Sequence, residues 1–349
     1  MKKKSFIYFL AFLFVSCQSE KIERSLIDDF SFNIPLVNEI EDLFGNTGRM
    51  IQLDTIMEAF VGRIGKIIKH ENHFFILSDD QRILHFDNDG KFISKLDKRG
   101  GGPGEYTRLD DFNLIKINGN TELWICDFKR IRKYVLSGNS WDFVGTIEFG
   151  FVINKFKIIL NEHILIATGQ NDESLLLTDI TGVPLRKYLK KEIPFLIFRA
   201  IQFVNYDSCI IFQLGVSNEA IEFNTKDYSF EHINIVNNER FLSSKSLLDM
   251  FNRFGQEYIG ELSKTNYIRG FNKVGDNSWL EYYQDGERFV AVKQKGVWKK
   301  MKVDIKNNFS MATLAFSESF DSFIRYEYPE DDHLNLLLNE YMLFDLMPK

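Results

Sequence analysis

Cysteine is scarce in this chain, with three residues in 349. The first, Cys17, lies in an N-terminal leader, so only Cys126 and Cys209 remain for the folded part. These two fall in predicted strands of different structural units, whereas a disulfide needs Cα atoms within about 7 Å of each other. We therefore expect two buried free thiols and no disulfide between them.

Positive charge is also in short supply. The chain has 43 Lys and Arg residues against 49 Asp and Glu residues, which gives a formal net charge of −6. A protein that binds nucleic acid, or an acidic membrane surface through its charge, needs a clustered basic excess. The composition therefore argues against both, and no nucleic-acid partner is expected.

Sequence signatures of phosphate, serine-hydrolase and metal sites are missing. There is no Gly-x-x-x-x-Gly-Lys-Ser/Thr loop and no Gly-x-Ser-x-Gly elbow. The six histidines have no Cys or carboxylate at a zinc spacing. The run Asp87–Gly90 fails as a calcium loop, because Gly90 at the sixth position would make His85 the first ligand and Leu96 the last. We predict no cofactor and no metal.

The apolar run at the N-terminus, Phe6 to Val15, is too short to span about 30 Å of hydrocarbon as a helix. Three lysines precede it, which is the pattern of a removed export signal over residues 1–16. The ending Phe14-Val15-Ser16-Cys17 resembles a bacterial lipobox, which implies that Cys17 is acylated and anchors the protein to a membrane. An ordinary secretory signal with an incidental cysteine is the alternative.

The residues after Cys17 are polar and include acids, from Gln18 to Glu23. They resemble the export tag that follows the lipidated cysteine in surface-displayed lipoproteins of Bacteroidetes, although a plain solvated linker has the same composition. We expect a lipidated tether over residues 17–30 and a location in the cell envelope, on the outer membrane. Whether the protein faces the periplasm or the cell surface stays open.

Short strand-like runs fill the rest of the chain, and they recur in groups of four. β-Branched and aromatic residues bounded by turn residues are typical of strands, and the 34 Phe residues suit sheets that pack face to face. Two clear groups cover residues 62–96 and 112–149, with Asp-Asn-Asp-Gly and Asn-Gly-Asn among their turns. A four-stranded meander that recurs about every 40 to 50 residues predicts the blades of a β-propeller.

Four further groups follow, at residues 151–189, 198–236, 266–303 and 311–328. The last shows only two clear strands, whereas Arg49 to Leu53 alternates like a strand that stands alone. Because a propeller ring commonly closes by pairing an N-terminal strand with the last blade, we assign Arg49 to Leu53 that role. The count predicts six blades in a single domain over residues 31–349.

Two segments have apolar residues at helical spacing instead. One lies within about residues 238–262, where Leu247, Phe251 and Phe254 belong to the pattern, and the other within residues 332–347, with Leu334, Leu338 and Tyr341. The predicted fold is therefore all-β, a six-bladed β-propeller of four-stranded antiparallel blades with a helical insertion and a C-terminal helix.

A glycine-rich loop joins the first two groups of strands and carries a resemblance to a known family. Gly100, Gly102, Pro103, Gly104, Glu105 and Tyr106, followed by Leu123-Trp124-Ile125-Cys126-Asp127, are similar to the six-bladed β-propeller lipoproteins of Bacteroidetes, relatives of the NHL-repeat propellers. We interpret the loop as structural: its glycines allow unusual backbone angles, and Glu105 accepts hydrogen bonds from the backbone. The resemblance implies fold and location, and no activity.

Polar residues on the first strand of each predicted blade are the candidates for a binding site, because that strand lines the centre of a propeller. The channel-lining candidates are Arg63, Lys66, Asp110, Asp111, Asn113, Arg199 and Arg269. We expect a non-catalytic binding or interaction scaffold for a glycan, peptide or protein ligand. The alternative is an enzyme of the lactonase or glycan-cleaving kind, with its site in the same channel.

Overall fold

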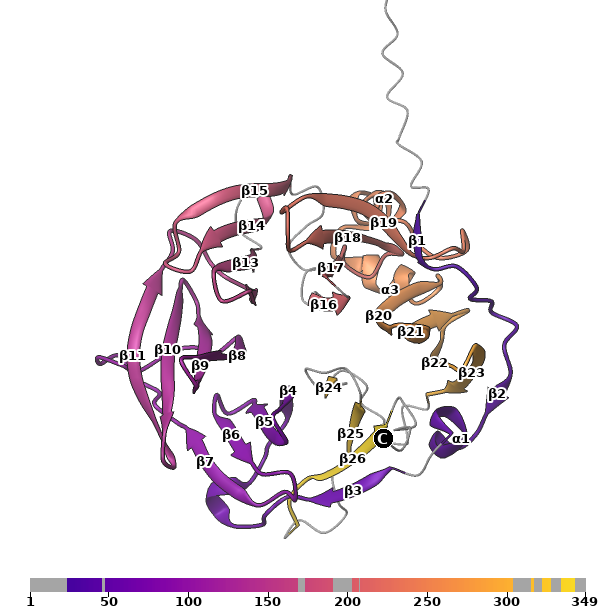
Figure 1. Ribbon diagram of the computed structural model, residues 1–349. Coiled ribbons are helices and arrows are strands. Elements are labelled where there is room, and N and C mark those ends of the chain that lie inside the picture. Colours follow the sequence, from indigo (N-terminus) through magenta and orange to yellow (C-terminus); the bar gives the residue numbers. More distant parts are fainter. Residues whose placement is uncertain are drawn as a thin grey trace, which may run out of the picture.

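A computed structural model describes residues 24–45, 48–168, 173–190, 203–206, 208–303, 315–316, 322–327 and 334–342. Figure 1 shows its sheets arranged around a common axis, each standing edge-on to the centre. Each of the six sheets contains an antiparallel meander whose strands follow chain order from the centre outwards, and three sheets receive their outermost strand from the N-terminal part of the chain. The chain is therefore a six-bladed β-propeller, as predicted.

The first three blades follow one another without interruption. Blade 1 is built from β4 (Ile64–His70), β5 (His73–Ser78), β6 (Ile83–Phe86) and β7 (Phe92–Leu96). Blade 2 is built from β8 (Asp111–Ile117), β9 (Asn120–Asp127), β10 (Arg130–Ser137) and β11 (Ser140–Glu148). Blade 3 is built from β12 (Lys155–Ile159), β13 (His163–Ala167), β14 (Glu173–Asp179) and β15 (Pro184–Lys190).

The last three blades include segments from the N-terminal part of the chain. Blade 4 has β16 (Phe203–Tyr206), β17 (Cys209–Gln213), β18 (Glu219–Asn224), β19 (Phe230–Val236) and the added β1 (Ser25–Ile27). Blade 5 has β20 (Tyr267–Val274), β21 (Asn277–Gln284), β22 (Glu287–Gln294), β23 (Val297–Lys302) and the added β2 (Leu36–Val37). Blade 6 has β24 (Ala315–Phe316), β25 (Ser322–Glu327), β26 (Leu337–Met342) and β3 (Arg49–Gln52).

Local sequence explains both the turns and the packing of these blades. Between β8 and β9, Asn118 and Gly119 have φ values of 51° and 84°, the left-handed pair that a tight hairpin turn requires. Along β9, Leu123 and Ile125 pack in the core shared with blade 1, whereas Trp124 and Cys126 pack in the core shared with blade 3. Since successive side chains of a strand point to opposite faces, each blade buries both faces against its neighbours.

The ring closes through the predicted N-terminal strand. β3 pairs antiparallel with β26, and Ile51 stands opposite Leu338. Beyond the pair, the Asn335 side-chain amide donates to the carbonyl oxygens of Asp54 and Ala59 at 2.7 and 2.8 Å, and its oxygen accepts from the Val61 amide at 3.0 Å. Asn335 is 1% exposed. The last blade is thus bound to the segment that leads into the first.

The segment before β3 lies on the propeller, which corrects the predicted extent of the tether. We expected a tether to residue 30, but β1 pairs in parallel with β19, and Leu26, Ile27 and Phe30 are buried. β2 likewise pairs in parallel with β23. The short helix α1 (Ile40–Phe44) follows, and Phe44 stacks on Tyr341 with ring centroids 5.0 Å apart. Strands of two or three residues are too short to show a periodicity in the sequence.

The helical insertion is confirmed. It consists of α2 (Ser244–Phe254), the 3-10 turn η3 (Gly255–Glu257) and α3 (Tyr258–Leu262), between β19 and β20. Ser243 caps α2, since its Oγ accepts from the Ser246 amide at 3.1 Å. A second 3-10 turn, η1 (Met57–Ala59), lies between β3 and β4. Among the helices in the described ranges, none has the length and hydropathy to cross a bilayer.

The predicted C-terminal helix is wrong, because Leu337–Met342 forms β26. Leu338 packs in the core that faces blade 1, and Tyr341 packs with Phe44 and Trp279 on the opposite face. A strand buried on both faces carries apolar residues without a clean alternation, so its sequence can imitate the spacing of a helix. Residues 332–333 and 343–347 of that prediction lie outside the described part of the chain.

The two cysteines of the described chain are both free, as predicted. Cys126 is buried, and its Sγ donates to the Ile153 carbonyl oxygen at 3.3 Å. Cys209 differs from the expectation because it is only half-buried. It is the first residue of β17, and the four residues after it in the strand are buried.

Candidate functional site

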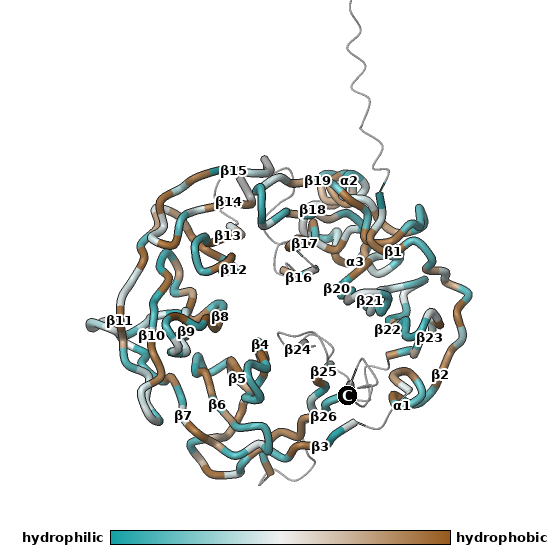
Figure 2. Tube along the Cα trace, viewed as in Figure 1, coloured by the Kyte–Doolittle hydropathy of each residue, from teal (hydrophilic) through white to brown (hydrophobic). Residues whose placement is uncertain are grey.

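The innermost strands of the blades define the candidate site. β4, β8, β12, β16, β20 and β24 each form the inner edge of a sheet and surround the axis of the ring (Figures 1 and 2). We call this axis and the side chains around it the central channel. The side chains of two predicted lining residues on these strands are partly exposed, Lys66 by 30% and Arg269 by 33%.

Three of the predicted residues converge where blades 1, 2 and 3 meet. The Lys66 ammonium of β4 lies 2.6 Å from Asp111 Oδ1 and also donates to the Phe112 carbonyl oxygen at 2.7 Å. Asp111 Oδ2 accepts from the amide of Phe156 on β12 at 3.2 Å, and Asn113 Nδ2 donates to the Phe156 carbonyl oxygen at 2.8 Å. The side chains of Asp111 and Asn113 therefore tie β8 to the strands on both sides of it.

Lys155 belongs to the same cluster and was not predicted. It begins β12, directly before Phe156, and is half-buried. Burial lowers the pKa of its ammonium, and the charge of Lys66 acts in the same direction, whereas Asp111 opposes the shift. The predicted third group of strands started its first strand at Phe156, so Lys155 was left outside it. Asp111 begins β8, and this could have indicated Lys155, which begins the neighbouring inner strand β12.

Two carboxylates next to this cluster are already paired. Asp110 Oδ1 accepts from Arg108 Nε at 2.6 Å, and burial raises the pKa of Asp110. Asp127 Oδ2 accepts from Arg132 Nε at 2.7 Å, while Asp127 Oδ1 accepts from the amide and hydroxyl of Thr107. These bonds hold the start of β8 against the turn between β9 and β10.

Arg269 lies apart from that cluster, in blade 5. Its guanidinium is 3.0 Å from Glu281 Oε1, and Arg288 approaches the same oxygen at 2.5 Å. Glu281 is buried, and burial raises its pKa while the two arginines oppose the rise. Two cations on one buried carboxylate leave an excess of positive charge at this part of the wall.

The remaining predicted lining residues are not brought into the cluster. Arg63 is exposed just before β4, and its backbone amide donates to Asp79 Oδ1 at 3.0 Å. Arg199 lies outside the described residues. Between blades 1 and 6, Lys69 pairs with Glu340, which also accepts from the Ser322 hydroxyl at 2.6 Å. Lys69 was missed because no sequence signal places its partner, which is far along the chain.

The glycine-rich loop binds blade 1 to blade 2. The Tyr106 hydroxyl donates to the Gln81 carbonyl oxygen at 2.5 Å, and Glu105 Oε2 accepts from the Gly102 amide at 2.7 Å. From the other blade, the Tyr134 hydroxyl donates to the Gly104 carbonyl oxygen at 3.1 Å. Burial raises the pKa of Tyr106 to about 12, so its hydroxyl stays a donor at neutral pH. Through these contacts the loop joins the two blades.

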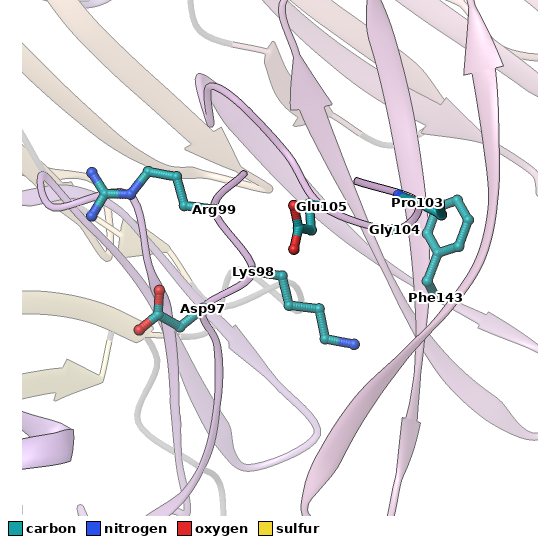
Figure 3. A pocket seen from close by; sticks show the side chains of 7 residues that line it. All are labelled: Asp97, Lys98, Arg99, Pro103, Gly104, Glu105 and Phe143. Atoms are coloured by element: carbon teal, nitrogen blue, oxygen red, sulfur yellow. The ribbon is translucent and has the colours of Figure 1, made fainter. Parts of the chain in front are cut away.

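A cleft of about 460 Å³ opens beside this loop. In Figure 3, Phe143 of β11 lies against Pro103 and Gly104, and the Arg99 side chain extends away from it. The Lys98 ammonium donates to the Trp141 carbonyl oxygen at 2.5 Å. A second cleft of about 370 Å³ shares Asp97 and Lys98 and follows β7 and the start of β11. Both clefts are at the boundary of blades 1 and 2, and neither includes the Lys66 cluster.

The acids, histidines and cysteines of the described ranges form no group of three that could hold a metal ion. His73 and His85 are neighbours, with His85 Nε2 3.0 Å from His73 Nδ1 and His85 Nδ1 3.1 Å from the Ser94 hydroxyl. Burial, with a smaller contribution from His73, lowers the pKa of His85 to about 3. His85 is therefore neutral at physiological pH and belongs to the packing between blades.

Comparison with known proteins adds a family and a set of similar folds. A family model described as a domain of unknown function (DUF4934) matches residues 38–333. A Bacteroides fragilis NCTC 9343 protein described as exported is similar in structure with a TM-score of 0.69 at 14% identity, over 90% of this chain and 98% of its own. A member of the DUF4221 family from Bacteroides vulgatus ATCC 8482 has a TM-score of 0.55 at 10% identity, over 84% and 96% of the two chains. No curated protein matches in sequence.

At these identities the two structures show a shared fold and nothing about a ligand. Both are covered almost completely by the comparison. The ring of blades is therefore common to the three chains, and the chemistry of the inner strands must be read from this sequence alone.

Replacing Gly104 with alanine should weaken the contact between blades 1 and 2. Gly104 has a φ of +74°, and an added Cβ would lie 2.9 Å from Cβ and Cγ of Phe143. We expect Gly104→Ala to lower the free energy of unfolding by about 1–3 kcal/mol in urea titrations. The matched control is Gly101→Ala in the same loop, where a Cβ meets nothing within 4 Å. Equal stability of the two variants would contradict this account of the loop.

Proposed function

This chain belongs to the DUF4934 family, and on that premise we propose that it is an exported, lipid-anchored binding protein that holds a ligand in its central channel without transforming it. The ligand classes that suit the proposal are a glycan, a peptide or a segment of a protein. The resemblance of the loop Gly100 to Tyr106 to the Bacteroidetes lipoproteins also supports a kinship with NHL-like propellers.

The observation that carries the binding proposal is the way charged side chains are held on the inner strands. Lys66 is fixed by Asp111, Lys69 by Glu340 and Arg269 by Glu281, and each carboxylate is itself buried. Two of these pairs, those of Lys66 and Lys69, join neighbouring blades. A wall whose polar groups are positioned before the ligand arrives loses little entropy when it binds, which favours recognition.

The proposed location rests on the leader and on the similar folds. Residues 1–16 have the pattern of an export signal, and Cys17 stands at the position that is acylated in lipoproteins. The similar protein of Bacteroides fragilis is described as exported, in agreement with such a location. Because β1 is the first described strand of the propeller, we propose that the tether ends before Arg24.

Replacing Cys17 with alanine should release the protein from membranes. An acyl chain on Cys17 would be the only proposed anchor, so Cys17→Ala is expected to move from the membrane pellet to the soluble fraction. The measurement is an immunoblot of fractions after a carbonate wash. Cys209→Ala, which removes a half-buried thiol within blade 4, is the control and should stay in the pellet. A Cys17→Ala protein that remains membrane-bound would contradict the anchor.

The binding proposal is tested by offering the purified full chain to glycan and peptide arrays, with product analysis of every ligand that is retained. We expect retention without conversion. Asp111→Asn should weaken it, because the change removes the charge that holds Lys66 and leaves one acceptor oxygen for Lys66 and the Phe156 amide. Glu148→Gln makes the same chemical change at an exposed ion pair with Arg130 on the outer strands, and should have no effect.

Two outcomes would count against a binding scaffold. If bound lactones or glycans are converted to products at a rate that Asp111→Asn abolishes, the channel is an active site. If no ligand is retained at all, or if the two variants bind equally, the central channel is not where recognition occurs.

A further inference from the structure

The inner strands have a charge opposite to that of the whole chain. The six inner strands together carry seven Lys or Arg residues and one acid, Asp111, although acids outnumber bases in the full sequence. The basic residues are Lys66, Lys69, Lys116, Lys155, Lys157, Arg269 and Lys273. Charge of one sign concentrated on a concave wall raises the local concentration of ligands of the other sign.

Several of these cations already have partners. Lys66 pairs with Asp111, Lys69 with Glu340 and Arg269 with Glu281. At the far end of the inner strands, Lys116 pairs with Glu71 at 2.6 Å, and Lys273 donates to the Leu26 carbonyl oxygen at 2.6 Å. Each of these positive charges is at least partly balanced within the fold.

Lys155 differs from them. With the residues that the structure describes, its ammonium forms no hydrogen bond and no ion pair, although it is half-buried beside the Lys66 cluster. Asp111, the carboxylate whose charge acts on Lys155, is paired with Lys66. The two other carboxylates around β8, Asp110 and Asp127, are paired with Arg108 and Arg132. A half-buried ammonium without a counter-ion has lost part of its hydration, and an anion from outside would offset that loss of free energy.

The surroundings of Lys155 suit a small oxyanion. Lys66 lies close enough for its charge to affect Lys155, and its side chain is 30% exposed beyond its contact with Asp111. Asp111 cannot supply the missing counter-charge by moving, because both of its oxygens are engaged, one by Lys66 and one by the Phe156 amide. The two lysines and one carboxylate therefore leave one positive charge in excess.

We propose that Lys155, together with Lys66, binds an oxyanion of the channel ligand, that is, a carboxylate, phosphate or sulfate group. The inference rests on the proposed function and narrows it to acidic ligands. The ligand would meet Lys155 at the start of β12, where blades 2 and 3 adjoin, and would complete the charge balance of the wall. Neutral glycans and peptides without acidic groups would lack this contact.

The first test needs no ligand. Lys155→Gln removes an unbalanced charge and should leave the thermal midpoint of the purified full chain unchanged or raise it. Lys66→Gln strands the buried Asp111 carboxylate and should lower the midpoint by several degrees. If Lys155→Gln loses as much stability as Lys66→Gln, Lys155 serves the fold and the proposal is wrong.

The second test measures binding by calorimetry. The probes are sodium sulfate, inorganic phosphate and an oligogalacturonate, with a neutral maltooligosaccharide as the comparison. Comparing the three acidic probes shows whether the site prefers a sulfate, a phosphate or a carboxylate group. We expect saturable binding of at least one acidic probe, weakened about tenfold or more in Lys155→Gln. Lys155→Arg keeps the charge and should retain most of the affinity.

Lys116→Gln is the matched control, because Lys116 is also on an inner strand but is paired with Glu71 at the other end. It should bind as the wild type does. Equal binding of an acidic probe by Lys155→Gln and the wild type, or a non-saturating response to all salts, would overturn the proposal. If the neutral probe binds the wild type and Lys155→Gln equally well, the result supports the proposed binding function and contradicts the preference for anions. If no probe and no array ligand binds, the proposed function fails as well.

Discussion

The pairing of β3 with β26 is the constraint on which the rest of the propeller depends. An open row of blades would leave strand edges at both ends, and closure removes them by giving blade 6 its outer strand from the start of the chain. Asn335 reinforces the joint with bonds to the segment that leads into blade 1. The N-terminal strands β1 and β2 likewise pair with the outer strands of blades 4 and 5, in parallel.

Closure also determines where the charges of the inner strands lie. Lys69 of blade 1 meets Glu340 of blade 6 only because the ring is closed, and Lys66 meets Asp111 because blades 1 and 2 are held together by the loop around Tyr106. Ion pairs of this kind add little net stability when they are buried, but they fix geometry. The positions of the charged side chains on the inner strands therefore follow from the order of the blades. Lys155 is placed beside Lys66 in the same way, because blade 3 follows blade 2 in the ring.

Most of the architecture could be predicted because the blades repeat local signals, such as the Asn118-Gly119 turn and the alternation along β9. β26 could not be predicted as a strand, because both of its faces are buried and its apolar residues have a spacing typical of a helix. β1 and β2 are too short to give a pattern. The first-strand rule placed Lys66, Asp111 and Asn113 on inner strands, where the structure has them. It left out Lys155, because the predicted strand began one residue late. Glu340, the partner of Lys69, could not be predicted, because the two residues meet only in the closed ring.

The most direct measurement of closure is urea unfolding of Ile51→Ala followed by tryptophan fluorescence. Ile51 on β3 is 3% exposed, and Met50 beside it is 72% exposed, so Met50→Ala is the control. All four tryptophans lie on strands of blades 2 and 5, and none lies on a strand of blade 6. The account predicts that Ile51→Ala shifts the fluorescence transition by about 2–5 kcal/mol while Met50→Ala leaves it in place. An unchanged transition in Ile51→Ala would show that blades 2 and 5 do not depend on the closing strand.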